Sequence, residues 1–319
     1  MRQAIIILLF SFKLYSQEFK QVAFYNLENL FDTIDNPETW DDQRTPNGVY
    51  KYNSKVYQTK VNNMAKVLAD LYNHANESGA ALTGLVELEN RSVLVDLINS
   101  KYLQSFKLKI IHEDSQDKRG IDVALLYDPN QFTPINFEYH EVRLWDKDSY
   151  RIYTRDILEV QGYLGDRQVY VFVNHWPSRR GGKKRSSRLR LAASKVLKNR
   201  IKAIIEKNKE VLLIAMGDFN DDPKDLSLKN LDSLLYNPFE RLHQLGNHTL
   251  VYNDRTNLFD QILINKVSSI EKICIFNPEY LIQKKGRYKG YPFRSYAGHM
   301  FQGGYSDHYP VYISINLSP

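Results

Sequence analysis

Short apolar runs alternate with longer amphipathic stretches along most of this chain. Apolar residues recur at helical spacing over residues 55–73, 93–98 and 187–206, which predicts three helices, the last of them long and basic. Short aliphatic runs bounded by Gly, Pro or Asp predict strands. These strands are expected at residues 21–25, 80–86, 106–111, 121–127, 155–163, 168–174, 211–216, 258–264 and 309–315. Because a hairpin around Gly165 and Asp166 interrupts the alternation, the pattern favours a mixed-sheet α/β sandwich over a doubly wound parallel sheet.

The length and composition of the chain fit one large domain. Its 319 residues, 43% of them hydrophobic and 25% charged, can bury a sizeable core. No internal repeat or low-complexity linker is visible, so a single domain is expected over residues 17–319, and a monomer is favoured. Cys274 is the only cysteine, which excludes a disulfide within these residues. The formal charge of +6 permits an anionic partner without requiring one.

The N-terminal residues have the pattern of a secretory signal. Arg2 supplies a positive charge, residues 4–12 form a short apolar run, and cleavage is expected after Ser16. The apolar run is too short to cross a bilayer as a helix. An N-terminal strand or a membrane anchor is the alternative. The protein is therefore expected to be secreted or periplasmic, with residues 1–16 as its signal peptide.

Polar residues stand where several of the apolar runs end. Asp218 and Asn220 follow the run 211–215. Side chains at i and i+2 of an extended chain point to the same side, so these two could converge on one phosphate. Glu87 ends the run 80–86, a position that is costly for a carboxylate unless it is paired or holds a cation. Taken singly, each such position also has an ordinary structural explanation.

Six motifs of this kind follow one another along the chain. They are Phe24-Tyr25-Asn26-Leu27-Glu28-Asn29, Gly84-Leu85-Val86-Glu87-Leu88-Glu89-Asn90, Val173-Asn174-His175-Trp176-Pro177-Ser178, Gly217-Asp218-Phe219-Asn220, Leu258-Phe259-Asp260-Gln261-Ile262-Leu263-Ile264 and Ser306-Asp307-His308. Their types and order, over residues 24–313, resemble the endonuclease/exonuclease/phosphatase superfamily. The resemblance implies a deoxyribonuclease-like α/β fold, a four-layer sandwich of two mixed β-sheets flanked by α-helices, with the active site where strand ends meet.

The resemblance also implies which residues bind metal. Glu87 is expected to be a direct ligand of a divalent cation, with Asn26 and Asp307 close by or acting through water. Glu89 is a competing ligand, but it is offset by two residues from the position that matches. Mg²⁺ or Mn²⁺ suits these oxygen and nitrogen donors, whereas Zn²⁺ would want more Cys or His.

The catalytic residues implied by the resemblance are His175, Asp218, Asn220, Asp260 and His308. His308 is expected to pair with Asp260 for acid/base chemistry. Asp218 would orient or deprotonate the attacking water. Asn220 and His175 would donate hydrogen bonds to the non-bridging phosphate oxygens, where negative charge builds in the transition state. The sequence leaves open which group is the general base.

The chain departs from the family pattern in two places. Val86 stands where Gln usually precedes the metal-binding Glu. The region that carries a Glu partner for the histidine matching His175 reads Arg119-Gly120-Ile121-Asp122 here, and Asp122 could take the place of that Glu. Arg155 matches a position that contacts phosphate in deoxyribonucleases. Three candidates for substrate binding come from these segments: Arg119, Asp122 and Arg155.

Two basic segments are further candidates for contacts with phosphates. Residues 179–190 carry seven cations and no acid, and they lead into a helix start, where cations oppose the macrodipole unless an anion is bound. Ordinary solvated surface is the alternative. Residues 284–305 interleave cations with aromatic rings, which suits stacking on bases or simple packing. The candidates for substrate binding in these segments are Arg179, Arg180, Lys183 and Arg294.

Together these features predict a secreted phosphodiesterase that depends on a divalent metal ion. We expect it to be an endonuclease with DNA as its main substrate and RNA as a further one. The alternatives are a secreted sphingomyelinase or phospholipase C, a phosphoinositide phosphatase, and a catalytically silent anion-binding module. The lipid enzymes need a surface that enters membranes, and no apolar or paired-aromatic hairpin is recognisable after residue 16. No stable membrane insertion is therefore expected.

Overall fold

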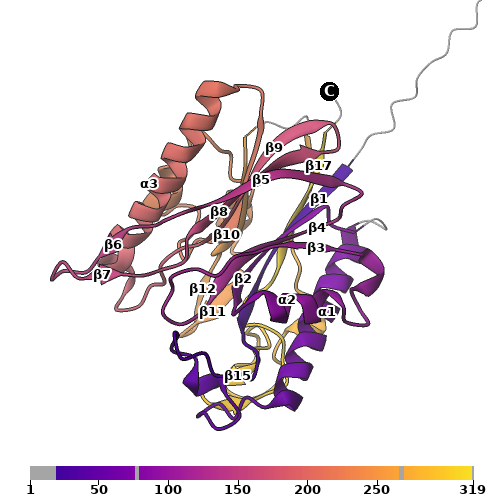
Figure 1. Ribbon diagram of the computed structural model, residues 1–319, viewed down its shortest axis with the longest axis vertical. Coiled ribbons are helices and arrows are strands. Elements are labelled where there is room, and N and C mark those ends of the chain that lie inside the picture. Colours follow the sequence, from indigo (N-terminus) through magenta and orange to yellow (C-terminus); the bar gives the residue numbers. More distant parts are fainter. Residues whose placement is uncertain (1–18, 76–78, 266–268, 318–319) are drawn as a thin grey trace, which may run out of the picture.

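The computed structural model describes residues 19–75, 79–265 and 269–317, and its centre is a pair of mixed β-sheets packed face to face (Figure 1). The larger sheet has six strands in the order β14 (Ser269–Ile275), β17 (Val311–Asn316), β1 (Phe19–Leu30), β2 (Leu82–Leu88), β4 (Asp122–Tyr127) and β3 (Lys109–Ile111). The smaller sheet has five in the order β13 (Asp260–Ile264), β10 (Leu212–Asp218), β9 (Arg167–His175), β8 (Ile157–Leu164) and β5 (Phe132–His140). Both sheets combine parallel and antiparallel pairs, because β1 runs parallel to β2 and antiparallel to β17, and β10 runs parallel to β9 and antiparallel to β13.

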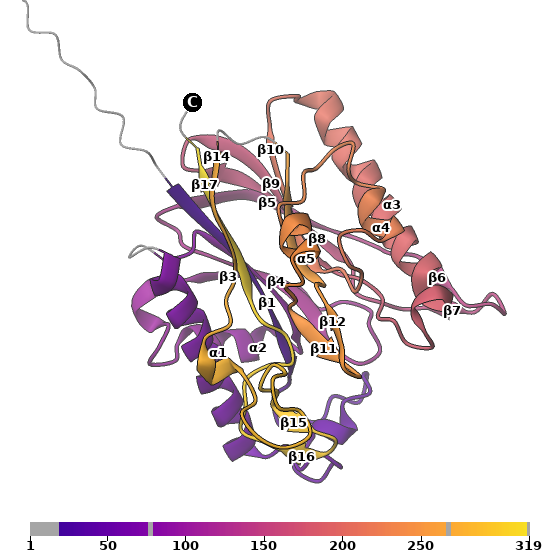
Figure 2. The ribbon, with the colours of Figure 1, turned by 180° about the vertical axis from the view of Figure 1, so that it is seen from behind.

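Helices cover the outer faces of both sheets (Figure 1, Figure 2). α1 (Ser54–Ala75) and α2 (Arg91–Ile98) pack on the six-stranded sheet, and α3 (Lys183–Lys207) and α4 (Leu226–Lys229) pack on the five-stranded sheet. The shorter elements are α5 (Phe239–Gln244), the 3-10 helices η1 (Asp42–Arg44), η2 (Gln104–Phe106) and η3 (Glu279–Leu281), and the strand pairs β6 (Leu144–Trp145) with β7 (Arg151–Ile152), β11 (Leu250–Tyr252) with β12 (Arg255–Asn257), and β15 (Tyr296–Ala297) with β16 (Met300–Phe301). The four layers helix, sheet, sheet, helix confirm the fold class expected from the sequence.

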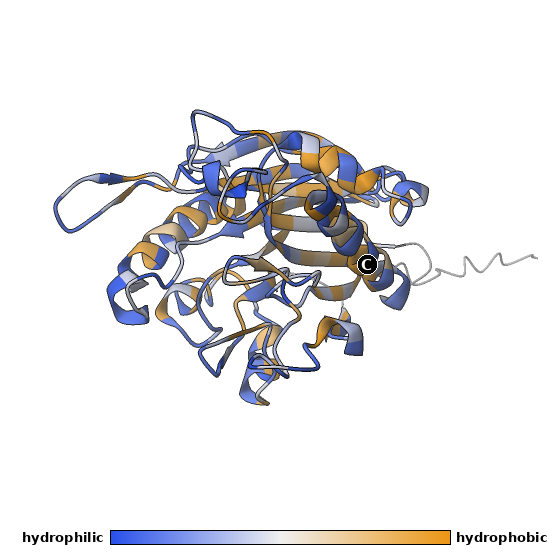
Figure 3. Ribbon diagram, turned by 90° about the horizontal axis from the view of Figure 1, so that it is seen from below, coloured by the Kyte–Doolittle hydropathy of each residue, from blue (hydrophilic) through white to orange (hydrophobic). Residues whose placement is uncertain are grey.

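Alternating side chains bury both faces of the central strands. On β1, Val22 and Phe24 belong to the core between the two sheets, whereas Ala23 and Tyr25 belong to the core beneath α1 and α2. Such a strand reads as a continuous apolar run because neither face meets water. Figure 3 shows the same arrangement, with the hydrophobic colour gathered on the stacked strands and on the inward faces of the helices.

Within the two main sheets, two strands escape detection in the sequence because they lie at sheet edges. β5 borders the five-stranded sheet and β14 borders the six-stranded sheet, and most of their residues are exposed or only half-buried. An edge strand needs no continuous apolar run, and it tolerates Pro134, which cannot donate a ladder hydrogen bond. The run 106–111 also differs from expectation, since η2 takes its first residue and only Lys109–Ile111 is strand.

Two expectations from the sequence concern membranes: a signal peptide at the N-terminus and no stable membrane insertion. The predicted signal peptide, residues 1–16, lies outside the described residues. Within the part of the chain that the structure describes, no helix combines the length and apolar character needed to cross a membrane.

Candidate active site

Polar side chains extend the apolar rows between the two sheets. On β9, Val169, Val171 and Val173 belong to the core between the sheets. The next residue at this spacing is His175, the last of the strand. The same period of two on the strands β1, β10 and β13 brings Asn26, Asp218 and Asp260 into line with core residues such as Phe24, Met216 and Ile262. Strand geometry therefore delivers these four polar residues to one end of the space between the sheets.

Glu87 reaches this site by a different route. Strict alternation along β2 would place Glu87 with Leu85 on the helix side of the sheet. A bulge after Val86 breaks the register with both neighbouring strands, and Glu87 adopts a left-handed backbone conformation with φ of 60°. Its carboxylate oxygen Oε1 then lies 3.8 Å from Nε2 of His175 on the opposite sheet. A strained backbone at a non-glycine residue is characteristic of functional sites.

Asp218 occupies the centre of the cluster. Its Oδ2 accepts a hydrogen bond from Nδ2 of Asn26 at 3.1 Å, and its Oδ1 accepts one from the backbone N–H of Asn220 at 2.9 Å. The Nε2 atoms of His175 and His308 lie 3.7 and 3.9 Å from the same Oδ2. Burial raises the pKa of Asp218 to about 7, with Asp260 and Glu87 adding to the rise and His308 opposing it. This carboxyl can therefore exchange a proton near neutral pH.

His308 and Asp260 form a buried hydrogen-bonded pair. Nδ1 of His308 lies 2.7 Å from Oδ2 of Asp260, as the sequence-based pairing requires. Burial alone would lower the pKa of His308, but Asp260 outweighs it through charge and hydrogen bonding, and the pKa lies well above its usual value. Asp260 therefore favours the protonated form of His308, whose Nε2 lies 3.9 Å from Oδ2 of Asp218.

His175 has the opposite electrostatic character. Burial lowers the pKa of His175 well below its usual value, and Arg155, Arg119 and His308 lower it further. Its buried Nδ1 has no hydrogen-bond partner in the described chain. Asp122 does not supply the missing carboxylate, because Asp122 accepts from the backbone N–H of Ser115 and faces a different histidine, His112. That part of the sequence-based expectation is wrong, since β4 starts at Asp122 and directs it away from His175.

The donor set at the site fits a divalent cation. One ligand atom each from Glu87, His175 and Asp218 lies within 4.8 Å of the others. The set combines carboxylate oxygens with an imidazole nitrogen that is neutral and therefore free to coordinate. Asp307, the third predicted ligand, instead pairs with Arg294, whose guanidinium also lies 3.6 Å from Glu28. Metal binding through Asn26 or Asp307 stays a prediction.

Two arginines approach the site from one side. Arg155 is buried and donates to Asp117 at 3.0 Å and to the backbone carbonyl of Trp176 at 2.9 Å. Arg119 pairs with the same Asp117, but nearly half of its side chain is exposed. Both raise the local positive potential that acts on His175. Arg119 is thus placed to contact an anion, whereas Arg155 acts from beneath the surface.

Asn220 is held by the backbone rather than directed at open space. β10 ends at Asp218, and Asn220 has a left-handed conformation with φ of 51°. Its Nδ2 donates to the carbonyl of Trp176 at 3.1 Å. The rule that side chains two residues apart share a side does not extend past the strand, so the convergence of Asp218 and Asn220 comes from the turn instead.

The basic segment 179–190 is partly neutralised by the protein itself. Arg179 donates to the carbonyl of Asn220, to Asn257 and to three carboxylates. Those carboxylates belong to Asp221, Asp222 and Asp225. Because these contacts occupy its guanidinium, Arg179 is not free to bind substrate, and that prediction is wrong.

The remaining cations of this segment divide into paired and exposed groups. Lys183 lies 2.6 Å from Asp225. This carboxylate supplies the negative charge that favours a helix start among cations, and α3 begins at Lys183 rather than at the expected residue 187. This correction removes Lys183 from the substrate-binding candidates. Arg180, Lys184 and Arg185 are exposed, and the structure records no carboxylate partner for them among its described residues.

Arg190 is fully buried and its Nε lies 2.7 Å from Oδ2 of Asp221. Replacing Arg190 with Met is expected to lower the free energy of unfolding by about 3–5 kcal/mol, because the buried carboxylate of Asp221 would lose its nearest cation and keep only Arg179 at 3.3 Å. Urea denaturation measures this loss. The matched variant Arg185→Met, which changes an exposed cation of the same helix, should stay within about 0.5 kcal/mol of the parent. Equal losses in both variants would contradict the structural role of Arg190.

Sequence inspection missed a buried charged network behind the site. Lys60, on α1, donates to the carbonyl of Glu28 at 2.6 Å and to the hydroxyl of Ser295 at 3.0 Å, and the Glu28 carboxylate accepts from the backbone of Ser295 at 2.6 Å. Burial lowers the pKa of Lys60 to about 8, and burial with Asp307 raises the pKa of Glu28 to about 7. Ser295 is more than 200 residues from Lys60 and Glu28, so no local pattern in the sequence indicates the network. The network fixes the loop before β15 against the end of β1.

The fold and the site together define a class of protein. Two mixed sheets that carry a carboxylate, a neutral histidine and an aspartate–histidine pair at adjoining strand ends form the framework of a phosphoester hydrolase. The model of the endonuclease/exonuclease/phosphatase family matches residues 21–317, and the chain belongs to this family. Enzymes of the family are generally metal-dependent phosphoester hydrolases. No curated protein matches the chain in sequence.

Several solved structures share the fold. Truncated TDP2 of Caenorhabditis elegans has a TM-score of 0.60 and 16% identity, with coverage of 93% of this chain and 97% of that one. The mannosyl-6-phosphatase of Bacteroides thetaiotaomicron has a TM-score of 0.57 and 16% identity, with coverage of 93% and 99%. The human Nocturnin catalytic domain with bound sulfate has a TM-score of 0.55 and 15% identity, with coverage of 95% and 98%. At such identities the likeness concerns the fold.

Proposed function

We propose that this protein is a secreted, divalent-metal-dependent endonuclease that cleaves DNA and also accepts RNA. The observation that carries the proposal is the contact between Asp218, Asn26 and the two histidines at the meeting point of the sheets. The leader-like residues 1–16 support export. Mg²⁺ or Mn²⁺ bound by Glu87 would neutralise charge on the phosphate, and His175 could complete its ligand set.

The residues around the metal ligands have complementary tasks. Asp218, with a pKa near neutrality, is suited to orient and deprotonate a water molecule. His308, whose protonated form is favoured by Asp260, can donate a proton or a hydrogen bond through Nε2. Arg119, whose side chain is nearly half exposed, can donate to phosphate oxygens at the rim. These roles leave the neutral His175 as a hydrogen-bond donor or a metal ligand.

The proposal of a nucleic acid substrate rests on a surface that we call the aromatic stripe. Its rings and cations alternate: the Arg151 guanidinium lies 5.4 Å from the Trp145 ring and 5.6 Å from the Tyr153 ring, and the Lys118 ammonium lies 5.5 Å from Tyr153 and 5.3 Å from Trp40. All three rings are substantially exposed. Exposed rings that alternate with cations suit stacking on bases beside a phosphate backbone.

The aromatic stripe adjoins the candidate active site through one loop. Lys118 precedes Arg119, whose charge acts on both Glu87 and His175. The backbone N–H of Trp40 donates to the carbonyl of Lys118 at 2.7 Å, which attaches Trp40 to the loop that carries Lys118 and Arg119. The other aromatic candidate, residues 284–305, gives less support, because Tyr296 is buried and Tyr291 is hydrogen-bonded to Asp254.

A lipid phosphodiesterase is the second candidate function. Against the sequence-based expectation, an aromatic hairpin is present: β6 and β7 project from the body of the molecule, and Trp145 and Tyr150 are exposed on it (Figure 1). Its tip, however, carries Asp146, Lys147 and Asp148. Charged groups at the tip oppose entry into a bilayer, so the hairpin fits a nucleic acid better than a membrane interior.

A panel of substrates tests the proposed function. The purified protein with Mg²⁺ or Mn²⁺ should convert supercoiled plasmid to nicked and linear forms, and it should cleave RNA more slowly. The competing substrates are sphingomyelin and a phosphoinositide, both presented in vesicles, and mannose 6-phosphate in solution. Turnover of one of these without plasmid cleavage would overturn the endonuclease proposal and would identify the alternative.

Replacement of the stripe residues Trp40 and Trp145 by Ala is expected to weaken binding of an uncleavable single-stranded oligonucleotide. Each lost stacking contact should cost about 1–3 kcal/mol, which corresponds to roughly 5- to 150-fold in the dissociation constant. Fluorescence anisotropy measures the effect. Tyr163→Ala is the matched control, since Tyr163 is also exposed but lies at the β8–β9 turn, at the opposite end of β9 from His175. Equal losses in control and stripe variants would exclude the stripe as a binding surface.

A further inference from the structure

A second group of metal-type side chains lies outside the candidate active site. His112 follows β3, Asp114 lies two residues further on, and Asp122 begins β4. One ligand atom from each of the three lies within 4.8 Å of the others. None of them belongs to the cluster of Glu87, His175 and Asp218, so the two groups share no residue.

His112 has an unsatisfied nitrogen aimed into this group. Its side chain is 1% exposed, and its buried Nε2 has no hydrogen-bond partner in the described chain. The nitrogen lies 3.4 Å from Oδ2 of Asp122 and 3.8 Å from Oδ1 of Asp114. A buried polar atom without a partner is costly, and it indicates an unrecorded ion or water.

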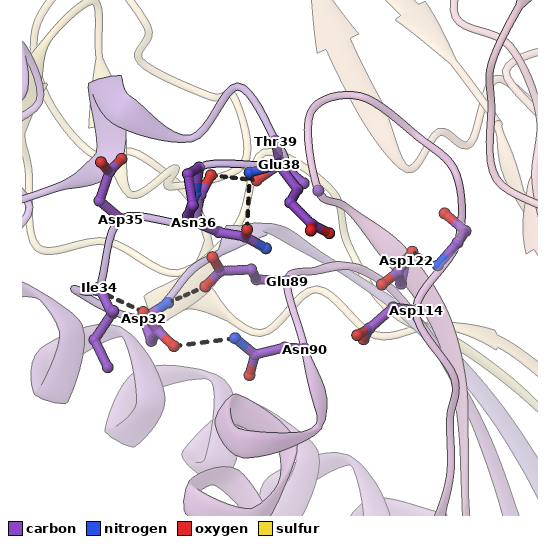
Figure 4. Close-up of a pocket in the computed structure, with 13 residues that line it drawn as sticks. Asp32, Ile34, Asp35, Asn36, Glu38, Thr39, Glu89, Asn90, Asp114 and Asp122 are labelled. Carbon is purple, nitrogen blue, oxygen red and sulfur yellow. Dashed lines mark hydrogen bonds between the residues drawn. The ribbon is translucent and has the colours of Figure 1, made fainter.

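The two aspartates are arranged as an oriented ligand and an accessible one. Oδ1 of Asp122 accepts from the backbone N–H of Ser115 at 2.9 Å, which fixes the carboxylate and leaves Oδ2 facing His112. Asp114 is 76% exposed, so the group opens to solvent on its side. Figure 4 shows Asp114 and Asp122 side by side at one edge of a pocket. A hydrogen bond that orients a ligating carboxylate is a regular feature of metal sites.

The pocket beside this group attracts cations. It has a volume of about 380 Å³, and its lining includes six carboxylates, those of Asp32, Asp35, Glu38, Glu89, Asp114 and Asp122. Such a concentration of acids creates a negative potential that draws in divalent ions.

We propose that His112, Asp114 and Asp122 bind a second divalent cation, a first-row transition metal such as Mn²⁺ or Zn²⁺, at the edge of this acidic pocket. Ligands of a tetrahedral zinc ion at about 2.0–2.1 Å lie about 3.3 Å from one another, close to the separation of His112 and Asp122. An imidazole ligand favours zinc and other first-row transition metals over Mg²⁺ and Ca²⁺, which select oxygen. Water from the pocket completes the coordination.

The cation clamps one loop of the protein. Its ligands come from the two ends of the segment between β3 and β4, so binding closes residues 112–122 into a ring. Lys118 and Arg119 lie within this segment, and Asp117 anchors it to Arg155. If the proposed function is correct, the ion fixes the part of the substrate surface that carries these two cations. The existence of the site does not depend on that function.

Calorimetric titration with Zn²⁺ tests the site. The variant Glu87→Gln serves as the background, because the candidate active site also offers a histidine and carboxylates. Zn²⁺ should bind this background protein, and adding Asp114→Asn should weaken the binding. The loss of affinity should exceed the ~10- to 100-fold that is typical when a residue hydrogen-bonded to a metal ligand is replaced. Asp114 is exposed, so its replacement should leave the fold intact. The added change Glu113→Gln, an exposed acid next to Asp114, is the control and should leave the affinity unchanged.

The location is tested independently of activity. Anomalous diffraction at the zinc edge from a soaked crystal of the parent protein should give a peak within bonding distance of Nε2 of His112. Hydrogen exchange of residues 113–121 should slow when Zn²⁺ is added and should not slow in Asp114→Asn. Equal Zn²⁺ affinity in the Asp114→Asn and Glu113→Gln proteins, or no anomalous peak at His112, would overturn the proposal. Loss of plasmid cleavage with an intact zinc site would instead contradict only the proposed function.

Discussion

Replacing Glu87 with Gln is expected to lower kcat by at least about 10²–10³-fold, the loss typical of removing one electrostatic stabiliser from a phosphoester-type site. The amide keeps the shape of the side chain but removes the negative charge that would attract a cation, at a carboxylate whose Oε1 lies 3.8 Å from Nε2 of His175. The affinity for Mg²⁺ or Mn²⁺ should fall in parallel. Single-turnover cleavage of plasmid at a series of metal concentrations separates the two effects.

The competing ligand provides the comparison for this experiment. Glu89 follows two residues later, and its carboxylate accepts a hydrogen bond from the backbone N–H of Asp32 at 2.6 Å. The bulge that turns Glu87 into the site leaves Glu89 in the acidic pocket. A loss confined to Glu89→Gln, or full activity of Glu87→Gln in the presence of EDTA, would refute the assignment of Glu87.

Removal of either member of the His308–Asp260 pair is expected to reduce kcat by about 10²–10⁴-fold, the range for a positioned acid or base. The two side chains are 2.7 Å apart and buried, so they act as one unit. The double variant His308→Ala with Asp260→Asn should therefore be little slower than the worse single variant. Pre-steady-state cleavage rates, with the fold checked by circular dichroism, measure the cycle.

An exposed histidine is the control for that cycle. His299 packs against the ring of Tyr50 at the surface, and His299→Ala should leave the rate unchanged. If the losses of the two single variants multiply in the double variant, the residues act independently. The hydrogen bond between them would then be structural rather than part of the chemistry.

The sequence predicts the members of the site better than it predicts their orientation. Asn26, His175, Asp218 and Asp260 continue apolar rows of period two, and this is a local pattern that can be read along each strand. Glu87 belongs to the site only because of a bulge and a positive φ, which depend on two neighbouring strands. Alternation alone would have placed its carboxylate against the helices.

The charged surroundings of the site depend on contacts that are distant in sequence. Arg179 looked like a free cation because no acid lies within its own segment. Its partners Asp221, Asp222 and Asp225 follow the next strand, more than 40 residues away. Likewise, the aromatic stripe is assembled from three separate loops, so only the folded chain brings Trp40, Lys118 and Trp145 onto one surface.

The position of β17 has a consequence for biosynthesis. Although it is the last strand in the described chain, it lies inside the larger sheet, between β14 and β1. Until the ribosome releases this segment, β1 keeps an unpaired edge. Asp260 also has no hydrogen bond to His308 until then, because His308 is synthesised 48 residues later. A nascent chain thus carries most of the residues of the candidate active site but not the hydrogen-bonded His308–Asp260 pair. The cell that makes the enzyme is therefore exposed to the complete site only after translation has passed the final strand.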